Sequence, residues 1–225
     1  MLKKYNQIIS SYTPSEFIPA EFLANPHYQT IVGSEAIRSK LFGYSRTFDC
    51  DRKRFDTPDG DFFYADFTQE NIESSALVIV LHGLESDANS PLVTKMATAF
   101  HSKGFQCCLM VFRGCSGEDN LRPGAYHVGF TKDLNQLSQY IKDTFPGKRI
   151  YLSGFSLGGN VCLKFLGELS DTAQDRNICG AAVTCVPFDP VASHYKLDAP
   201  GTMIILLASL PRQMAHILHL LFFFF

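Results

Sequence analysis

The sequence predicts an α/β fold built on a doubly wound, mostly parallel sheet, and three observations support this prediction. From residue 76 onward, short apolar runs alternate with segments of helical periodicity, which is the order of parallel strands joined by crossover helices. The apolar runs are continuous, as expected for strands that helices cover on both faces. With 225 residues and 46% hydrophobic content, the chain can build one sizeable core.

The segment before this alternation is expected to be less regular. Residues 1–45 contain three prolines, which prevent long helices, and we predict an irregular segment that packs on the core. His27 lies in a polar and aromatic cluster of this segment and is interpreted as a structural hydrogen-bonding residue. In residues 54–67, Asp59-Gly60 separates two β-prone runs, and glycine supplies the positive φ of a tight turn. An antiparallel hairpin is therefore expected to open the sheet.

The first strand and helix of the alternation have clear signals. Residues 76–81 are wholly apolar and predict a buried strand. A helix is expected over 91–103, because Ser90 suits an N-cap, proline is favoured at the first helical position and Gly104 can close the helix. The second parallel strand is predicted over 106–112.

The later elements continue the same pattern. A second helix follows Thr131, since apolar residues recur there on one helical face. Residues 149–153 predict the third strand, a helix follows Ser156, and residues 178–186 predict the fourth strand. In such a sheet, ligands bind beyond the carboxyl ends of the strands.

Charge and cysteine content argue against several classes of protein. The net charge is −2 and the basic residues are dispersed, so nothing favours nucleic-acid binding. Seven cysteines at spacings that fit no zinc site are expected to be reduced core residues of an intracellular, cytoplasmic protein. The first residues include no apolar stretch long enough for a signal peptide.

The most informative stretch is Gly154-Phe155-Ser156-Leu157-Gly158, a G-x-S-x-G pattern between the third strand and the following helix. Such a turn is so tight that the serine takes a strained conformation, and side chains at the two glycine positions would collide with backbone. The serine hydroxyl then lies at a helix N-terminus, which favours developing negative charge. We predict that Ser156 attacks a carbonyl carbon. The flanking strand and helix argue against an ordinary loop.

Two backbone N–H groups are expected to stabilise the oxyanion that such an attack creates. One belongs to Leu157, directly after the nucleophile, and the other to Leu84 in the loop after the first parallel strand. His82 ends that strand and is interpreted as a structural hydrogen-bonding residue rather than a base. Arg113, after the second strand, either pairs with an acid in the loops or contacts a substrate; the sequence leaves both open.

Several blocks of the chain together resemble one known family. The blocks occur in the order of the type-4 family of the AB hydrolase superfamily, which includes plant embryogenesis-associated hydrolases and related esterases and lipases. The resemblance covers roughly residues 20–198. The matching blocks are Asn25–Thr30, Leu81–Leu84, Phe112–Gly117, Gly129–Leu134, Gly154–Asn160 and Pro187–Asp189.

This resemblance implies an α/β-hydrolase fold that hydrolyses carboxylic esters with a Ser–Asp–His triad and without metal or organic cofactor. It implies a small-molecule ester or a lipid as substrate, because some relatives act on acylglycerols or phospholipids. Peripheral contact with a membrane and the oligomeric state stay open.

The family pattern fades after about Leu197-Asp198. On this fold the triad acid and histidine follow the serine, yet no further strand–helix unit or family acid or histidine motif is recognised. The resemblance thus implies a C-terminally truncated domain that lacks its last strands and helices. We expect an incomplete α/β-hydrolase domain over 46–200 and an apolar, atypical tail over 201–225. The chain is expected to be inactive or impaired.

Two residues after the fourth strand could replace the missing partners. Asp189 and His194 lie on the correct side of the sheet, but a span of five residues is short for building both an acid and a base around Ser156. By resemblance, Asp189 is not the triad acid. A rebuilt Ser156–His194 pair is therefore the disfavoured alternative.

Residues 203–225 are strongly apolar and allow three interpretations: a membrane-spanning helix, a segment that packs across the sheet edge, or a sequence without a selected role. We favour the last, in which His216 and His219 carry no function. Polar residues at 212 and 213 argue against a spanning helix. The alternative function is a non-catalytic hydrolase-fold protein that binds a lipid or a protein partner.

Overall fold

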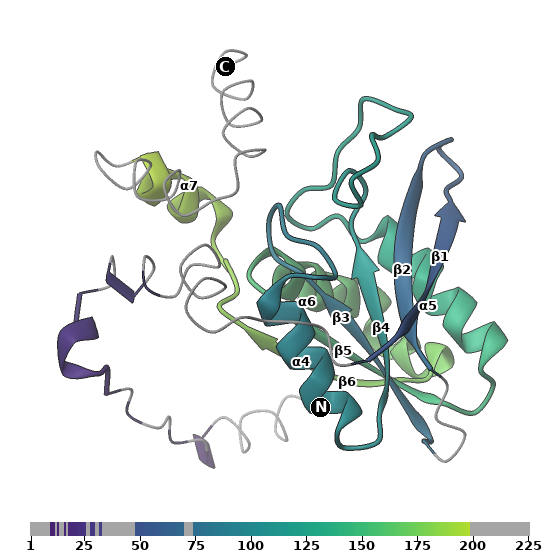
Figure 1. Ribbon diagram of the computed structural model, residues 1–225, viewed down its shortest axis with the longest axis horizontal. Coiled ribbons are helices and arrows are strands. Elements are labelled where there is room, and N and C mark those ends of the chain that lie inside the picture. Colours follow the sequence, from purple (N-terminus) through teal and green to yellow (C-terminus); the bar gives the residue numbers. More distant parts are fainter. Residues whose placement is uncertain are drawn as a thin grey trace.

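The computed structural model describes residues 48–69 and 74–198 continuously, together with residues 10, 11, 13, 16, 18–25, 28, 29 and 32 (Figure 1). In the N-terminal region it places a 3₁₀ turn, η1 (Glu21–Leu23). His27, most of segment 1–45 and the whole of segment 201–225 lie outside the described residues, so the expectations for them stay predictions.

Six strands form one mixed sheet in the order β1-β2-β4-β3-β5-β6. The pairs β1/β2 and β2/β4 are antiparallel, whereas β3/β4, β3/β5 and β5/β6 are parallel. The predicted hairpin and the mostly parallel sheet are thus confirmed. The strands are β1 (Cys50–Asp56), β2 (Phe62–Thr68), β3 (Ala76–Leu81), β4 (Gln106–Val111), β5 (Arg149–Phe155) and β6 (Ile178–Thr184).

The hairpin turn forms where the sequence predicts it. Gly60 has a φ of +79°, which is the left-handed conformation that favours glycine. The N–H of Thr57 donates to the carbonyl of Asp61 at 2.8 Å, and the N–H of Gly60 donates to the carbonyl of Thr57 at 2.9 Å. These bonds close the turn and set the register of β1 on β2.

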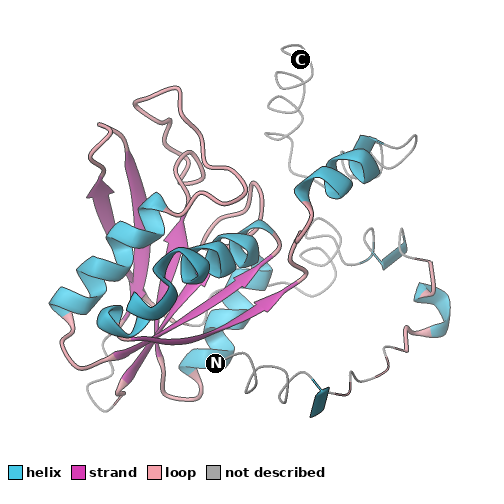
Figure 2. Cartoon of the chain, turned by 180° about the vertical axis from the view of Figure 1, so that it is seen from behind, coloured by secondary structure: helices cyan, strands magenta, loops and turns pink. Residues whose placement is uncertain are grey.

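Helices cover both faces of the sheet (Figures 1 and 2). Helices α5 and α6 pack on the face that carries Leu77 and Ile79, whereas α4 packs on the face that carries Val78 and Val80. This alternation along β3 follows from the two-residue period of a strand and gives two apolar layers. The helices are α4 (Pro91–His101), α5 (Lys132–Thr144), α6 (Leu157–Leu169), η2 (Ser170–Arg176) and α7 (Pro190–Asp198).

The strand β6 differs from the prediction. It ends at Thr184 instead of residue 186, and most of its side chains are exposed or partly exposed. Cys179 is exposed on this strand and Cys185 is exposed just after it, so the expectation that all seven cysteines lie in the core is wrong for these two. Their exposure follows from position, because β6 is an edge of the sheet, whereas β3 and β4 are completely buried.

Candidate active site

Ser156 occupies the turn between β5 and α6. Its φ of +53° and ψ of −125° are unusual for a residue with a side chain and cost about 1–3 kcal/mol. The surrounding backbone holds this conformation: the Ser156 N–H donates to the carbonyl of Thr184 at 2.9 Å, and the Ser156 carbonyl accepts from the N–H of Asn160 at 3.1 Å. The partly exposed serine therefore lies at the carboxyl edge of the sheet and at the N-terminus of α6.

The glycines around the serine are required by backbone contacts. A Cβ atom on Gly154 would lie 2.6 Å from the carbonyl carbon of Gly158, and one on Gly158 would lie 2.5 Å from the carbonyl oxygen of Leu81. Both distances are far below van der Waals contact, and both neighbours are backbone atoms that cannot rotate away. The collisions predicted from the G-x-S-x-G pattern are confirmed.

The loop after β3 lies directly against this turn. A Cβ atom on Gly83 would lie 2.8 Å from the Phe155 ring and 3.4 Å from the Cβ of Ser156. Among the described residues, the N–H of Leu84 donates to no protein acceptor. Leu157 is the first residue of α6, so its N–H has no acceptor within the helix. The structure thus brings the loop that carries Leu84 beside the turn that carries Ser156 and Leu157.

His82 is completely buried beneath this loop. Its Nδ1 lies 2.7 Å from the carbonyl oxygen of Gly83, and its Nε2 accepts the backbone N–H of Phe112 at 3.1 Å. These partners place the proton on Nδ1. Burial lowers the pKa of His82 from 6.5 to about 4, although the Gly83 carbonyl opposes this shift. The imidazole is therefore neutral and fully bonded, as the structural interpretation of the sequence expects.

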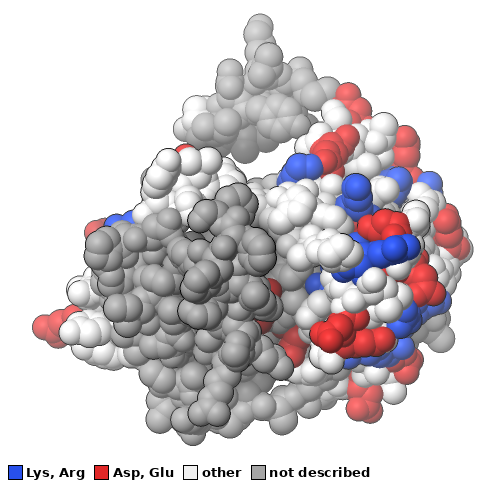
Figure 3. Space-filling view, turned by 90° about the horizontal axis from the view of Figure 1, so that it is seen from above, with Lys and Arg blue, Asp and Glu red and all other residues white. Residues whose placement is uncertain are grey.

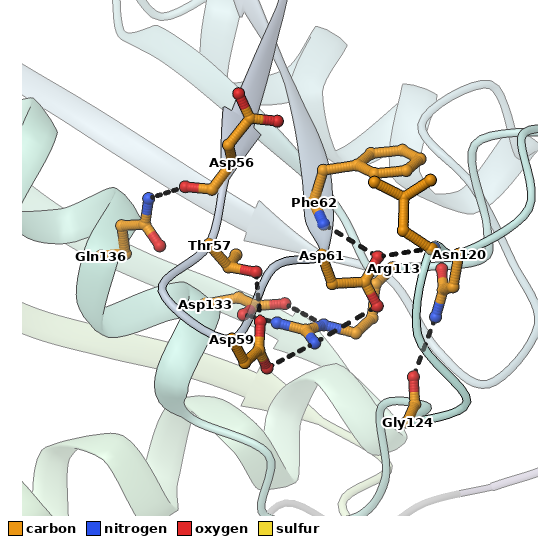
Figure 4. Close-up of polar contacts among 11 residues, drawn as sticks. Asp56, Thr57, Asp59, Asp61, Phe62, Arg113, Asn120, Gly124, Asp133 and Gln136 are labelled. Atoms are coloured by element: carbon orange, nitrogen blue, oxygen red, sulfur yellow. Dashed lines mark hydrogen bonds and ion pairs between the residues drawn. The ribbon is translucent and has the colours of Figure 1, made fainter.

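Arg113 pairs with acids, which decides between the two roles that the sequence leaves open. Its guanidinium forms two hydrogen bonds with Asp133, at 2.9 and 2.6 Å, and one with Asp59, at 2.9 Å (Figure 4). Burial alone would lower the pKa of Arg113, but the bonds to the carboxylates raise it well above its usual range. Arg113 therefore ties the hairpin turn to the first turn of α5.

Tyr126 is a residue near the site that the sequence analysis did not single out. It lies in the long connection between β4 and α5, and its hydroxyl bonds to Glu85 in the loop after β3. No periodicity or spacing marks such a contact, because the two residues are 41 positions apart and both lie in loops.

Asp189 and His194 are not brought together with Ser156. The Asp189 carboxylate accepts the N–H of Ala192 at 2.9 Å and thereby caps α7, a helix that the sequence analysis did not predict. His194 is exposed on α7 and its ring lies beside that of Tyr195. Within residues 48–69 and 74–198, no hydrogen bond joins His194 to Ser156 or to Asp189. His216 and His219 lie outside the described residues.

The described residues form neither a metal-binding group nor a membrane-spanning helix. In the part of the chain that the structure describes, no three His, Cys, Asp or Glu side chains are grouped to hold a metal ion. None of the helices in that part could span a lipid bilayer; the spanning helix considered for 203–225 concerns residues outside it. On the face seen in Figure 3, acidic and basic side chains are interspersed over the described surface.

Comparison with protein families finds a match to the alpha/beta hydrolase fold over residues 76–218. The candidate esterase YheT of Escherichia coli (strain K12) is 30% identical over 188 residues, which are 82% of this chain and 52% of YheT. The embryogenesis-associated protein EMB8 of Picea glauca is 30% identical over 118 residues, which are 52% of this chain and 25% of EMB8.

A monoacylglycerol lipase of Saccharomyces cerevisiae (strain ATCC 204508 / S288c) is 29% identical over 128 residues, which are 56% of this chain and 28% of the lipase. The chain thus spans between about a quarter and about half of the length of these relatives. Among solved structures, the Pyrococcus furiosus esterase Pf2001 has a TM-score of 0.57 at 22% identity, over 77% of this chain and 60% of the esterase. This likeness concerns the fold.

Proposed function

Because the chain belongs to the alpha/beta hydrolase family, we propose that it is a carboxylic ester hydrolase in which Ser156 is the nucleophile. The observation that carries this proposal is the strained serine between β5 and α6, at a helix N-terminus and beside the loop after β3. A residue with a side chain persists at positive φ only where its surroundings enforce it, and such strain gathers at functional sites.

The proposed chemistry is acyl transfer. The Ser156 oxygen attacks the acyl carbon of an ester while its proton passes to a base or to water, and the carbonyl oxygen becomes the anion of a tetrahedral intermediate. Collapse of this intermediate breaks the ester C–O bond and releases the alcohol, and water then hydrolyses the acyl-serine. The N–H groups of Leu84 and Leu157, on the two sides of the serine, are the donors proposed for this anion, and the N-terminus of α6 adds a favourable dipole. Preorganised donors of this kind contribute about 3–4 kcal/mol each to stabilising the transition state.

The relatives guide the proposed substrate class. Their names describe a candidate esterase, a monoacylglycerol lipase and, in mouse, a phospholipase. For this chain we propose a small acyl ester, an acylglycerol or a phospholipid, hydrolysed without a metal or organic cofactor.

The described site holds no base in position to take the Ser156 proton. Within the described residues no imidazole bonds to the Ser156 hydroxyl, and His82 is neutral, buried and fully bonded. We therefore propose that this chain is impaired in turnover. An oxyanion site and substrate binding without a triad leave only about a thousandfold acceleration over water.

The same observation favours a second candidate function, which is binding of a lipid or a protein partner without catalysis. The two candidates make different predictions about Ser156. A hydrolase, even an impaired one, needs the Ser156 oxygen for turnover. A binding protein has no turnover and does not need this oxygen.

The test compares Ser156→Ala with Ser102→Ala, an exposed serine at the end of α4. Hydrolysis of p-nitrophenyl butyrate and covalent labelling by a fluorophosphonate are measured on the full 225-residue chain. We expect both signals in the native chain and in Ser102→Ala, and neither in Ser156→Ala. Equal signals in all three proteins would remove Ser156 from the chemistry, whereas no signal in any of the three would favour the binding function.

A further inference from the structure

Tyr126 reaches across from the β4–α5 connection to the loop that follows β3. Its hydroxyl accepts the backbone N–H of Glu85 at 2.7 Å and donates to the Glu85 carboxylate at 3.0 Å. Glu85 has a φ of +51°, the left-handed conformation that a residue with a side chain adopts at a cost. The phenol thus holds both the main chain and the side chain of a strained residue next to Leu84.

The bonds to this loop fix both peptide planes beside Leu84. The Gly83 carbonyl, which shares a planar unit with the Leu84 N–H, bonds to His82. The Glu85 N–H, which shares the next planar unit with the Leu84 carbonyl, bonds to Tyr126. Because each peptide unit is planar, holding one atom in each plane restricts φ and ψ of Leu84. The two bonds together therefore restrict the direction of the Leu84 N–H.

Tyr126 can do this because its own ring is immobilised. The ring stacks on Phe112 with centroids 4.9 Å apart and planes 4° apart, and only 9% of the residue is exposed. The edge of the His82 ring lies against the same aromatic pair. The backbone N–H of Phe112 bonds to His82, so the three rings form one buried unit beneath the loop.

We infer that Tyr126 is a positioning residue for the oxyanion site, where its hydroxyl holds the loop so that the Leu84 N–H faces the acyl group on Ser156. This inference rests on the proposed function, because it gives the Leu84 N–H its role. Tyr126 touches no reacting atom and acts through the backbone of Glu85.

Tyr126→Phe tests this inference because it removes the hydroxyl and keeps the stacked ring. The matched control is Tyr140→Phe, which removes the hydroxyl that accepts a hydrogen bond from Lys53 on the surface of α5. We expect Tyr126→Phe to speed deuterium exchange at the Glu85 amide and to lower kcat for p-nitrophenyl butyrate about tenfold with little change in KM. Tyr140→Phe should change neither.

A second measurement does not depend on turnover. Butyrate carries the carboxylate of the product, and its binding can be followed at the amide resonances of Leu84 and Leu157. We expect Tyr126→Phe to weaken this binding about fivefold, the effect of one misdirected hydrogen bond. Absence of butyrate shifts at these amides in the native chain, or equal affinity in Tyr126→Phe, would overturn the inference.

The two proposals fail in different ways. Turnover that persists in Ser156→Ala contradicts the hydrolase, whereas exchange, kcat or butyrate affinity unchanged by Tyr126→Phe contradicts the role of Tyr126. Faster exchange at Glu85 with unchanged kcat would also overturn the inference, because the hydroxyl would then stabilise the loop without serving the oxyanion site.

Discussion

The backbone N–H of Phe112 donates a hydrogen bond to Nε2 of His82 over 3.1 Å, joining the ends of two neighbouring parallel strands in the centre of the sheet. This bond requires an unprotonated Nε2, and the Gly83 carbonyl requires the proton on Nδ1. A proton added to His82 would remove the acceptor of Phe112 at a completely buried position. The arrangement therefore couples the geometry of the loop after β3 to pH.

Stability should fall as the pH is lowered from 6.5 to about 4, the interval between the ordinary pKa of histidine and that of buried His82. In this interval the unfolded chain binds a proton at His82 that the folded chain does not. The stabilisation of the folded state by neutral His82 is therefore complete above the interval and is lost below it. The loss should reach about 3 kcal/mol.

Urea unfolding at a series of pH values measures this loss. His82→Gln should lower stability at neutral pH and remove most of the slope, whereas replacement of the exposed His101 by glutamine should retain it. An identical slope in His82→Gln would show that other groups cause the pH dependence.

Gly158→Ala should destabilise the protein by about 2–4 kcal/mol. The added Cβ would overlap the backbone carbonyls of His82 and Leu81, and backbone atoms can yield only by moving β3 away from α6. The matched control is Gly167→Ala on the same helix, where a Cβ has no neighbour within 4 Å. This control should stabilise the protein by about 0.5–1 kcal/mol, because alanine favours the helix over glycine.

Thermal unfolding of both variants is the measurement. Opposite signs for the two alanine substitutions are expected. A Gly158→Ala protein as stable as Gly167→Ala would mean that α6 does not approach β3 as closely as the structure shows.

Replacement of Arg113 by methionine should lower the free energy of unfolding by about 3–5 kcal/mol. The change leaves the Asp133 carboxylate, which is only 1% exposed, without the guanidinium that bonds to both of its oxygens. Lys164→Met breaks an exposed pair with Glu168 one helical turn away and should cost under about 1 kcal/mol. Urea unfolding at neutral pH distinguishes the two, and equal losses would contradict a structural role of the buried pair.

Most of the elements can be predicted from the sequence because each has a local cause. Continuous apolar runs mark β3 and β4, Asp59-Gly60 marks the hairpin, and the spacing of two glycines around Ser156 marks the turn into α6. These signals depend on residues within a few positions of one another, so periodicity and turn chemistry are sufficient to find them.

The contacts that hold the candidate site could not be predicted in the same way. Arg113 bonds to Asp133 and Asp59, which are 20 and 54 residues away in the sequence. Tyr126 bonds to Glu85, which is 41 residues away. These contacts depend on how loops meet at the sheet edge, which no local pattern encodes. Helix α7, in contrast, has a local signal in the sequence. Asp189 directly precedes Pro190, and an aspartate before a proline is a helix-start signal.

Asp189 provides a prediction that separates a helix cap from a catalytic acid. If the carboxylate only caps α7, Asp189→Ala should destabilise that helix by about 1 kcal/mol and leave Ser156-dependent labelling unchanged. Asp189→Asn should restore the cap, because an amide oxygen can also accept the N–H of Ala192. If Asp189 instead oriented His194 toward Ser156, both substitutions and His194→Gln should abolish labelling, because an asparagine cannot stabilise an imidazolium. Labelling rates together with the helical circular dichroism of the three variants decide between these roles, and the absence of a bond between Asp189 and His194 among the described residues favours the cap.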